Sequence, residues 1–172
     1  MVSLKLDVSG QTMKKNNFGF TLVELLVVIS IIGILASIAL VSFTSSQKQA
    51  RDTVRKSDTK QYQLALENYA NKNGGLYPQR PDGGGVVAWT TLCADIILTG
   101  CPQDPRYAKD TSFVYRYQSN GSISNGTPAA TSYVIWAKLE NITVTTYWIV
   151  CSNGKSGVLT SGIPPTGGTC PL

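Results

Sequence analysis

One acidic side chain, Glu24, lies inside the most apolar stretch of the chain. From Phe20 to Phe43 the sequence holds no other charged residue and no proline. An ionisable group inside a membrane is costly, so it is rare there and marks a functional position. A positively charged partner offsets that cost. Glu24 is therefore the first candidate functional residue, and the chemistry that it suggests is ion pairing within an apolar environment.

The other reactive side chains are four cysteines, Cys93, Cys101, Cys151 and Cys170, which all follow the apolar stretch. In an exported domain they would form two disulfides. Four cysteines can pair in three ways, and we favour Cys93–Cys101 and Cys151–Cys170 because these near pairs close the two least regular segments. Zinc is the competing interpretation, but no two cysteines have the short Cys-x-x-Cys spacing of most zinc sites.

The composition argues against several other kinds of site. The chain contains no histidine, which excludes Ser-His-Asp and Cys-His catalysis and histidine-ligated metals. The net charge of +5 is small and dispersed, so it does not indicate nucleic-acid binding. Asp82, Asp95, Asp104 and Asp110 raise the question of calcium, but they do not form a spaced ligand series, so we expect turn and solubilising carboxylates. The sequence predicts a protein that is not an enzyme and has no cofactor, with calcium as a minor alternative.

The stretch that contains Glu24 is long enough to cross a membrane. It has 24 residues, and a bilayer core of about 30 Å is spanned by about 20 helical residues. Lys14 and Lys15 precede it, which should keep that end in the cytoplasm and direct the remainder of the chain outward. A secretory signal has its small-residue cleavage site after the apolar core. Here the small residue Gly19 comes before it, so a cut there would leave the helix on the mature chain.

Residues 14–26, Lys-Lys-Asn-Asn-Phe-Gly-Phe-Thr-Leu-Val-Glu-Leu-Leu, resemble the cleavage and methylation motif of type IV pilins and type II secretion pseudopilins. The resemblance implies that a membrane aspartic prepilin peptidase cuts between Gly19 and Phe20, and that the new amine of Phe20 is N-methylated. It places Glu24 where the family keeps a glutamate that pairs with the amine of a neighbouring subunit. The implied fold is α+β and type IV pilin-like, with a long N-terminal helix, membrane-spanning in its first half, packed on a small antiparallel β-sheet.

This interpretation divides the chain into four parts. They are a leader that is removed (1–19), a transmembrane and filament-core helix (20–43), an amphipathic continuation of the helix (44–73), and an exported loop and sheet domain with a disulfide-bonded C-terminal tail (74–172). Met1 and Met13 are both open as the start of the leader.

We expect one continuous helix from about Phe20 to Lys72, ended by Asn73-Gly74-Gly75. The side chains expected to form its inward stripe are Val54, Asp58 or Gln61, Tyr62, Ala65, Leu66, Tyr69 and Ala70. The charged run from Lys48 to Lys60 is expected to face solvent rather than to dock on another subunit.

After the helix, the sequence predicts a short helix between Cys93 and Cys101 and then a sheet. Three segments alternate with period two: Phe113–Gln118, Tyr133–Leu139 and Val144–Val150. Asn153-Gly154 predicts a hairpin into Gly157–Leu159. These three or four strands would form an antiparallel sheet that covers the Tyr62–Ala70 stripe, with Tyr115, Tyr133, Trp136 and Trp148 as core or cross-strand residues.

The leading functional hypothesis is a filament subunit, either a type IV pilin or a type II secretion pseudopilin. Its partners would be copies of itself and other pilins, the prepilin peptidase, an inner-membrane assembly platform and the membrane. It would first lie in the cytoplasmic membrane as a single-pass precursor and then in an extracytoplasmic or cell-surface filament. The alternative is a membrane-anchored binding module that never polymerises, for which Glu24 would have no purpose.

Overall fold

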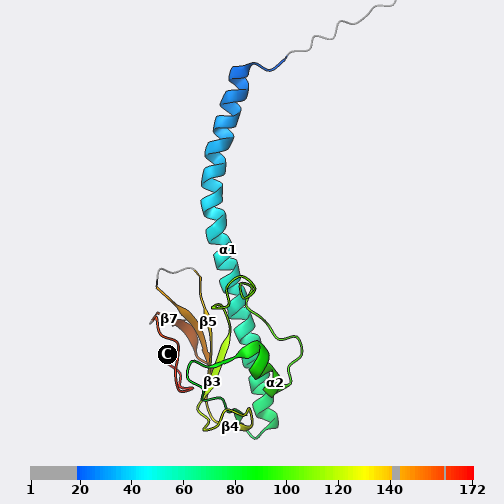
Figure 1. Cartoon of the computed structure of the whole chain (residues 1–172), viewed down its shortest axis with the longest axis vertical. Coiled ribbons are helices and arrows are strands. Elements are labelled where there is room, and N and C mark those ends of the chain that lie inside the picture. The colour runs from blue at the N-terminus through cyan, green and yellow to red at the C-terminus, as the bar shows by residue number, and fades with distance from the viewer. Residues whose placement is uncertain (1–18, 141–143, 161) are drawn as a thin grey trace, which may run out of the picture. The chain divides into compact units, whose positions relative to one another are not determined.

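The structure is a computed structural model that describes residues 19–140, 144–160 and 162–172, with the backbone alone for residues 39–42. The leader therefore lies outside the described residues except for Gly19. The elements in chain order are α1 (Leu22–Lys72), β1 (Tyr77–Pro78), β2 (Val86–Val87), the π-helix η1 (Ala88–Leu92), α2 (Cys93–Ile96), β3 (Arg116–Ser119), β4 (Pro128–Ala130), β5 (Tyr133–Lys138), β6 (Tyr147–Cys151) and β7 (Ser156–Leu159) (Figure 1). The chain divides into two compact units, Met1–Val41 and Ser42–Leu172, and each is described by itself.

The described part of the first unit is the apolar beginning of α1. The helix begins at Leu22 rather than at Phe20, and its large apolar side chains, from Leu22 to Ile38, are exposed. Ser30 and Ser37 donate their hydroxyl protons to the carbonyls of Val27 and Ile34 at 2.8 and 2.7 Å, so these hydroxyls are paired within the helix. By length and composition α1 can cross a membrane. Within the described part of this unit, the large apolar side chains are not buried against one another or against other residues.

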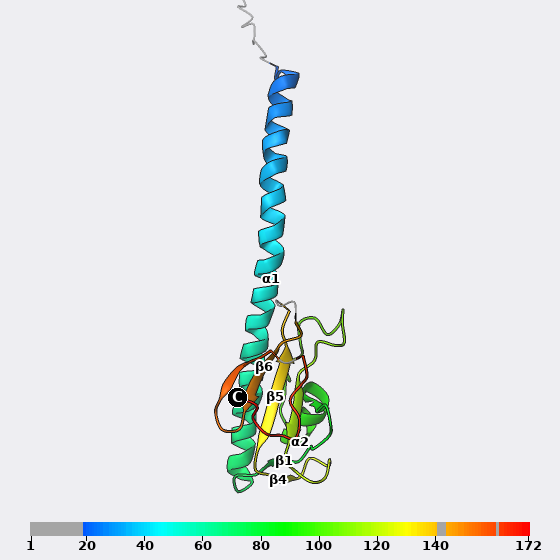
Figure 2. The ribbon, with the colours of Figure 1, turned by 90° about the vertical axis from the view of Figure 1, so that its left-hand side faces the viewer.

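In the second unit, the rest of α1 lies along one face of a sheet (Figure 2). Tyr62, Leu66 and Ala70 follow one another at the four-residue spacing of a helix face and are buried, as predicted. The helix ends at Lys72, also as predicted, where Gly74 and Gly75 adopt φ angles of 67° and 83° that favour glycine.

The predicted stripe was wrong in its first turns. Val54 is 44% exposed, and the inward face is formed instead by Asp52, Arg55 and Thr59. Ala65 and Tyr69, also expected inside, are half-buried. Of the two alternatives Asp58 and Gln61, Asp58 is buried and Gln61 is exposed. The apolar stripe was assumed to continue toward the N-terminus, whereas the buried stripe changes there from apolar to charged side chains.

The main sheet has five antiparallel strands in the order β2-β3-β5-β6-β7, and β1 pairs with β4 in a separate two-stranded sheet. Three or four strands were predicted, so β2 and the β1–β4 pair were missed, because runs of two or three residues cannot display a period of two. The hairpin between β6 and β7 was predicted correctly, and Gly154 takes a φ of 81° in its turn.

The two faces of the sheet carry separate apolar clusters. Tyr133, Ile135 and Ala137 of β5 pack with α1, together with Tyr115 and Tyr117. The alternate residues Val134 and Trp136 pack on the opposite face with Ile149 and Cys151. Tyr115, Tyr133 and Trp136 are thus core residues, as expected, whereas Trp148 is half-buried beneath Lys56, whose Nζ lies 4.9 Å from the ring centroid.

Cys93 is joined to Cys101 and Cys151 to Cys170, with Cα–Cα distances of 6.3 and 5.6 Å. These are the two pairs favoured from the sequence. The first closes the segment that contains α2, and the second fastens the C-terminal tail to the end of β6. Cys170 thereby packs against the cluster on the face of the sheet away from α1.

A pair of leucines tests which face of α1 is buried. Leu66→Ala should lower the free energy of unfolding by about 3 kcal/mol, because Leu66 is fully buried and its truncation leaves a cavity. Leu64→Ala, the matched control on the same helix, should change it by about 0.5 kcal/mol or less, because Leu64 is 57% exposed. Urea unfolding of the detergent-solubilised chain, followed by tryptophan fluorescence, measures both. Equal losses would contradict the assigned face.

Candidate functional site

The first candidate site lies at the start of α1, where Thr21 and Glu24 bind each other. The Thr21 backbone N–H and hydroxyl donate to Glu24 Oε2 at 2.8 and 2.6 Å, and the Glu24 N–H donates to Thr21 Oγ1 at 3.2 Å. This reciprocal arrangement is a capping box, which satisfies free N–H groups at a helix N-terminus. This capping role was not predicted, although the Thr-x-x-Glu spacing of Thr21 and Glu24 is its sequence signal.

The residues flanking the expected cut are open to solvent in this unit. Gly19 is exposed, and Phe20 retains 90% of its accessible surface. Cleavage between them would leave a free amine on Phe20, one residue before the N–H that already donates to Glu24. The geometry therefore brings Glu24 close to the position that a new chain end would take.

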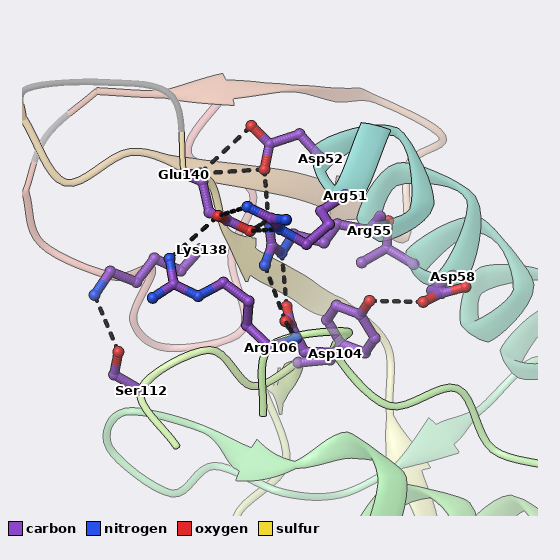
Figure 3. Close-up of polar contacts among 11 residues, drawn as sticks. Arg51, Asp52, Arg55, Asp58, Asp104, Arg106, Ser112, Lys138 and Glu140 are labelled. Atoms are coloured by element: carbon purple, nitrogen blue, oxygen red, sulfur yellow. Dashed lines mark hydrogen bonds and ion pairs between the residues drawn. The ribbon is translucent and has the colours of Figure 1, made fainter. Parts of the chain in front are cut away.

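The second candidate site is a buried cluster of charges in the second unit, centred on Arg55 (Figure 3). Its guanidinium forms a two-pronged contact with Asp104, from Nε to Oδ2 at 2.7 Å and from Nη2 to Oδ1 at 2.9 Å. Nη1 lies 2.7 Å from Asp52 Oδ1 and 2.7 Å from Glu140 Oε1. The Arg55 side chain is fully buried, so three carboxylates compensate one desolvated cation.

Glu140 also forms ion pairs with two further arginines, which are partly exposed. Arg51 donates to its two carboxylate oxygens at 2.7 and 2.6 Å, and Arg106 Nη1 lies 3.1 Å from Oε2. Burial raises the pKa of Glu140, but hydrogen bonds from Arg51 and Arg55 outweigh burial and hold the pKa at about 2. Glu140 therefore stays ionised in the folded protein far below the ordinary pH range of a glutamate.

A hydrogen bond extends this cluster toward the apolar core. Tyr115 donates its hydroxyl proton to Asp58 Oδ2 at 2.6 Å. Asp58 lies on α1, one helical turn after Arg55. Burial raises the pKa of Asp58, although this hydrogen bond acts in the opposite direction. The ring of Phe113 lies beneath the guanidinium groups of Arg55 and Arg106, whose Cζ atoms are 4.8 and 4.4 Å from its centroid. The cluster thus connects α1, the loop at Asp104 and the segment after β5.

The expectation that the Lys48–Lys60 run forms a solvated face was therefore wrong for part of it. Asp52, Arg55 and Asp58 within the run are buried, because their partners arrive from distant parts of the chain. Charge spacing within a helix cannot reveal partners that lie on other elements. Lys48, Lys56 and Lys60 are exposed, as expected of a solvated face.

The four aspartates considered for calcium take different roles. Asp104 binds Arg55 and Asp95 binds Arg80, each at 2.7 Å, so the expectation of solubilising carboxylates was wrong for these two. Asp104 does act in a turn, as was also expected, because it accepts the Arg106 N–H at 2.8 Å. Asp82 accepts a hydrogen bond from Ser124, and Asp110 accepts one from the Ser112 N–H at 3.0 Å. Within the described ranges, no group of three or more His, Cys, Asp or Glu side chains could hold a metal ion.

The N-terminal part of the chain matches a known sequence motif. Residues 14–40 match the model of the prokaryotic N-terminal methylation motif. The chain is 34% identical over 97 residues to the type II secretion system core protein G of Pseudomonas aeruginosa, a match that covers 56% of this chain and 63% of that protein. It is 26% identical over 131 residues to the type IV major pilin protein PilA of Myxococcus xanthus, covering 69% of this chain and 59% of that protein.

The chain carries the prokaryotic N-terminal methylation motif and is similar in sequence to a type II secretion pseudopilin and to type IV pilins. A third relative, a probable minor fimbrial protein of Dichelobacter nodosus, is 28% identical over 160 residues, which cover 86% of this chain and 95% of that protein. The chain spans less than two thirds of the length of the first two relatives. No solved structure matches it significantly. The long apolar helix and antiparallel sheets agree with the pilin-like α+β fold that was predicted.

Arg55→Met tests whether the charged cluster holds the second unit together. The change should lower the free energy of unfolding by about 3 to 5 kcal/mol, because Asp52, Asp104 and Glu140 would keep their buried charges without the central cation. Lys48→Met is the matched control, since it removes an exposed charge from the same helix. Urea unfolding should show a loss for Arg55→Met alone. Similar small effects of both changes would support a solvated face instead.

A second prediction concerns acid. The pKa of Glu140 is about 2 in the folded protein against 4.5 for a free glutamate, so its contribution to stability is fully present above about pH 4.5 and is lost as pH falls toward 2. The contribution is on the order of 2 kcal/mol. Glu140→Gln should therefore be less stable than the parent chain at pH 7, and the two should converge between pH 5 and 2. Parallel stability curves over that range would rule out this role.

Proposed function

We propose that the chain is a structural subunit of a type IV pilus-like filament or of a type II secretion pseudopilus. The observation that carries the proposal is an ionisable residue, Glu24, in an exposed apolar helix whose surrounding residues match the N-terminal methylation motif. Such a helix needs an apolar environment, first lipid and then other copies of itself. The proposal involves no catalysis and no cofactor.

Processing is the first step of the proposal. A prepilin peptidase cleaves the Gly19–Phe20 bond, and the new Phe20 amine is N-methylated. The motif match and the exposure of both residues support this step. Lys14 and Lys15 hold the leader in the cytoplasm, so the precursor is a single-pass protein of the cytoplasmic membrane with its second unit exported. Two disulfides in that unit agree with an oxidising compartment.

Assembly is the second step. An assembly platform in the inner membrane transfers the helix from lipid into a filament core, where helices of successive subunits pack together. The Glu24 carboxylate then pairs with the N-terminal amine of a neighbouring subunit and sets the position of each new copy. Two charges of opposite sign cost less together in an apolar core than either charge alone, which makes the correct position the favoured one.

The relatives include both a pilin and a secretion pseudopilin, so the proposal is made for the polymerisation that the two classes share. Imaging of cells distinguishes the two. A type IV pilin would form fibres on the cell surface, whereas a pseudopilin filament would remain within the envelope.

Glu24→Gln tests the assembly step and separates it from helix capping. Glutamine can replace glutamate in a capping box, so the helix start should persist while the charge is lost. We expect cleavage and membrane insertion at wild-type levels, measured by mass spectrometry of the mature N-terminus and by fractionation, with at least a tenfold loss of filaments by electron microscopy. Thr21→Ser, which keeps the hydroxyl that binds Glu24, is the matched control and should assemble.

Filament formation by Glu24→Gln at the wild-type level would mean that the charge is not needed, and that Glu24 serves as a cap. A parent chain that is exported and stable but never forms filaments with its own assembly proteins would instead support a membrane-anchored binding module.

A further inference from the structure

The face of the main sheet that points away from α1 carries two positive side chains among aromatic ones. Arg116 of β3 lies opposite Trp136 of β5 in the strand register, and Lys138 of β5 lies opposite Tyr147 of β6. Their sequence neighbours Tyr117 and Ala137 pack with α1, which places these four side chains on the other face. Three adjacent strands thus present the half-buried side chains Arg116, Lys138 and Tyr147 on one surface, whereas Trp136 on the same face is only 2% exposed.

This surface forms the floor of a hollow of about 440 Å³. Gly83 and Gly84 of the loop before β2 form one wall, and Pro164 of the C-terminal tail contributes to another. A side chain at Gly85 would clash with the ring of Trp136, so the glycine allows the loop to close on the floor. Ser112 and Val114 complete the lining, and none of the nine lining residues is acidic. The volume lies within the range of small-molecule sites, about 300–1,000 Å³.

Arg116 differs from the other arginines of the second unit in having no carboxylate partner among the described residues. Arg51, Arg55, Arg80 and Arg106 each contact a carboxylate. Among the described residues, Arg116 has no carboxylate in ion-pair contact, and its Nη1 donates to the Gly85 carbonyl at 2.8 Å, which orients the guanidinium. The remaining donors of this planar group are available for a planar anion.

Lys138 adds a second positive charge at the hollow. Its Nζ lies 3.2 Å from Ser112 Oγ and 4.9 Å from the centroid of the Phe113 ring. Asp110 interacts with it electrostatically but is not a lining residue. The two cations repel each other, and no lining carboxylate offsets this repulsion. A bound anion would attract both cations and so offset it.

We propose that this hollow binds the carboxylate-bearing ring of an acidic sugar, a uronate. The carboxylate would pair with Arg116 and Lys138, and the apolar C–H face of the ring would pack against Tyr147, which is half-buried. Ser112 offers a hydroxyl for the ring hydroxyls. A nucleic-acid strand is disfavoured because it needs cations along a groove, whereas here only two cations line a single hollow. The proposal concerns the second unit alone and does not depend on polymerisation.

Binding of trigalacturonate to the detergent-solubilised full chain, measured by isothermal titration calorimetry, tests the proposal. We expect binding that weakens with added salt, and no binding of the neutral trisaccharide galactotriose. Arg116→Gln should weaken trigalacturonate binding at least tenfold. Lys109→Gln, the matched control, removes an exposed positive charge outside the hollow and should change the affinity less than twofold.

A second variant guards against an effect on folding, since Arg116 also binds the Gly85 carbonyl. Lys138→Gln should weaken binding at least threefold while the near-ultraviolet circular dichroism stays that of the parent chain. Unchanged affinity in well-folded Arg116→Gln, or equal binding of galactotriose, would overturn the proposal. Tighter binding of inorganic phosphate, a glutamate-rich peptide or single-stranded DNA than of trigalacturonate would also overturn it. Such outcomes are independent of filament formation.

Discussion

The second unit depends on the desolvation of one guanidinium. Arg55 has no exposed side-chain surface, so its folded state requires Asp52, Asp104 and Glu140 to be in place together. These partners come from α1, from the loop before β3 and from the end of β5. A change in the register of α1 against the sheet would leave several buried charges unpaired at once, which costs far more than a shift of apolar contacts. The cluster therefore specifies one position of helix and sheet, whereas the apolar stripe at Tyr62, Leu66 and Ala70 supplies the hydrophobic part of the stability.

The two units differ in where their apolar side chains are buried. This difference agrees with a helix that moves from lipid to a filament, as proposed above. The second unit buries five tyrosines and the centre of its charged cluster within itself, and a disulfide fastens its tail. The described part of the first unit leaves large apolar side chains exposed and pairs its serine hydroxyls within the helix. Its surface is compatible with lipid or with other apolar helices, because its large side chains are apolar and the Ser30 and Ser37 hydroxyls are paired within the helix. On the proposed function, transfer from membrane to filament would thus require no change in the core of the exported domain.

Much of this architecture could be predicted from local patterns. The N-terminal motif, the end of α1 at Lys72, the main strands and the β6–β7 turn all depend on residues close together in the sequence. The parts that could not be predicted depend on distant partners. Asp104 and Glu140 bury Arg55, and Val86–Val87 becomes a strand by pairing with β3. Asp95 is likewise hidden by Arg80. The hollow beside Arg116 has the same origin, since it is assembled from three strands, a glycine loop and the tail.

Glu24 shows how a local role and an assembly role can reside in one side chain. Its Oε2 accepts hydrogen bonds from the N–H and hydroxyl of Thr21, and its own N–H donates to Thr21 Oγ1, before any partner is present. This reduces the cost of keeping the group in an apolar environment, so the precursor can persist as a monomer. The hydrogen bonds leave the negative charge uncompensated, however, because both donors are neutral. An amine that arrives at the same end of the helix would therefore gain most of the available Coulomb energy, since the low dielectric strengthens it. The proposed assembly requires such a carboxylate. Hydrogen bonds stabilise it in the single subunit, and the amine of a neighbouring chain would stabilise it further.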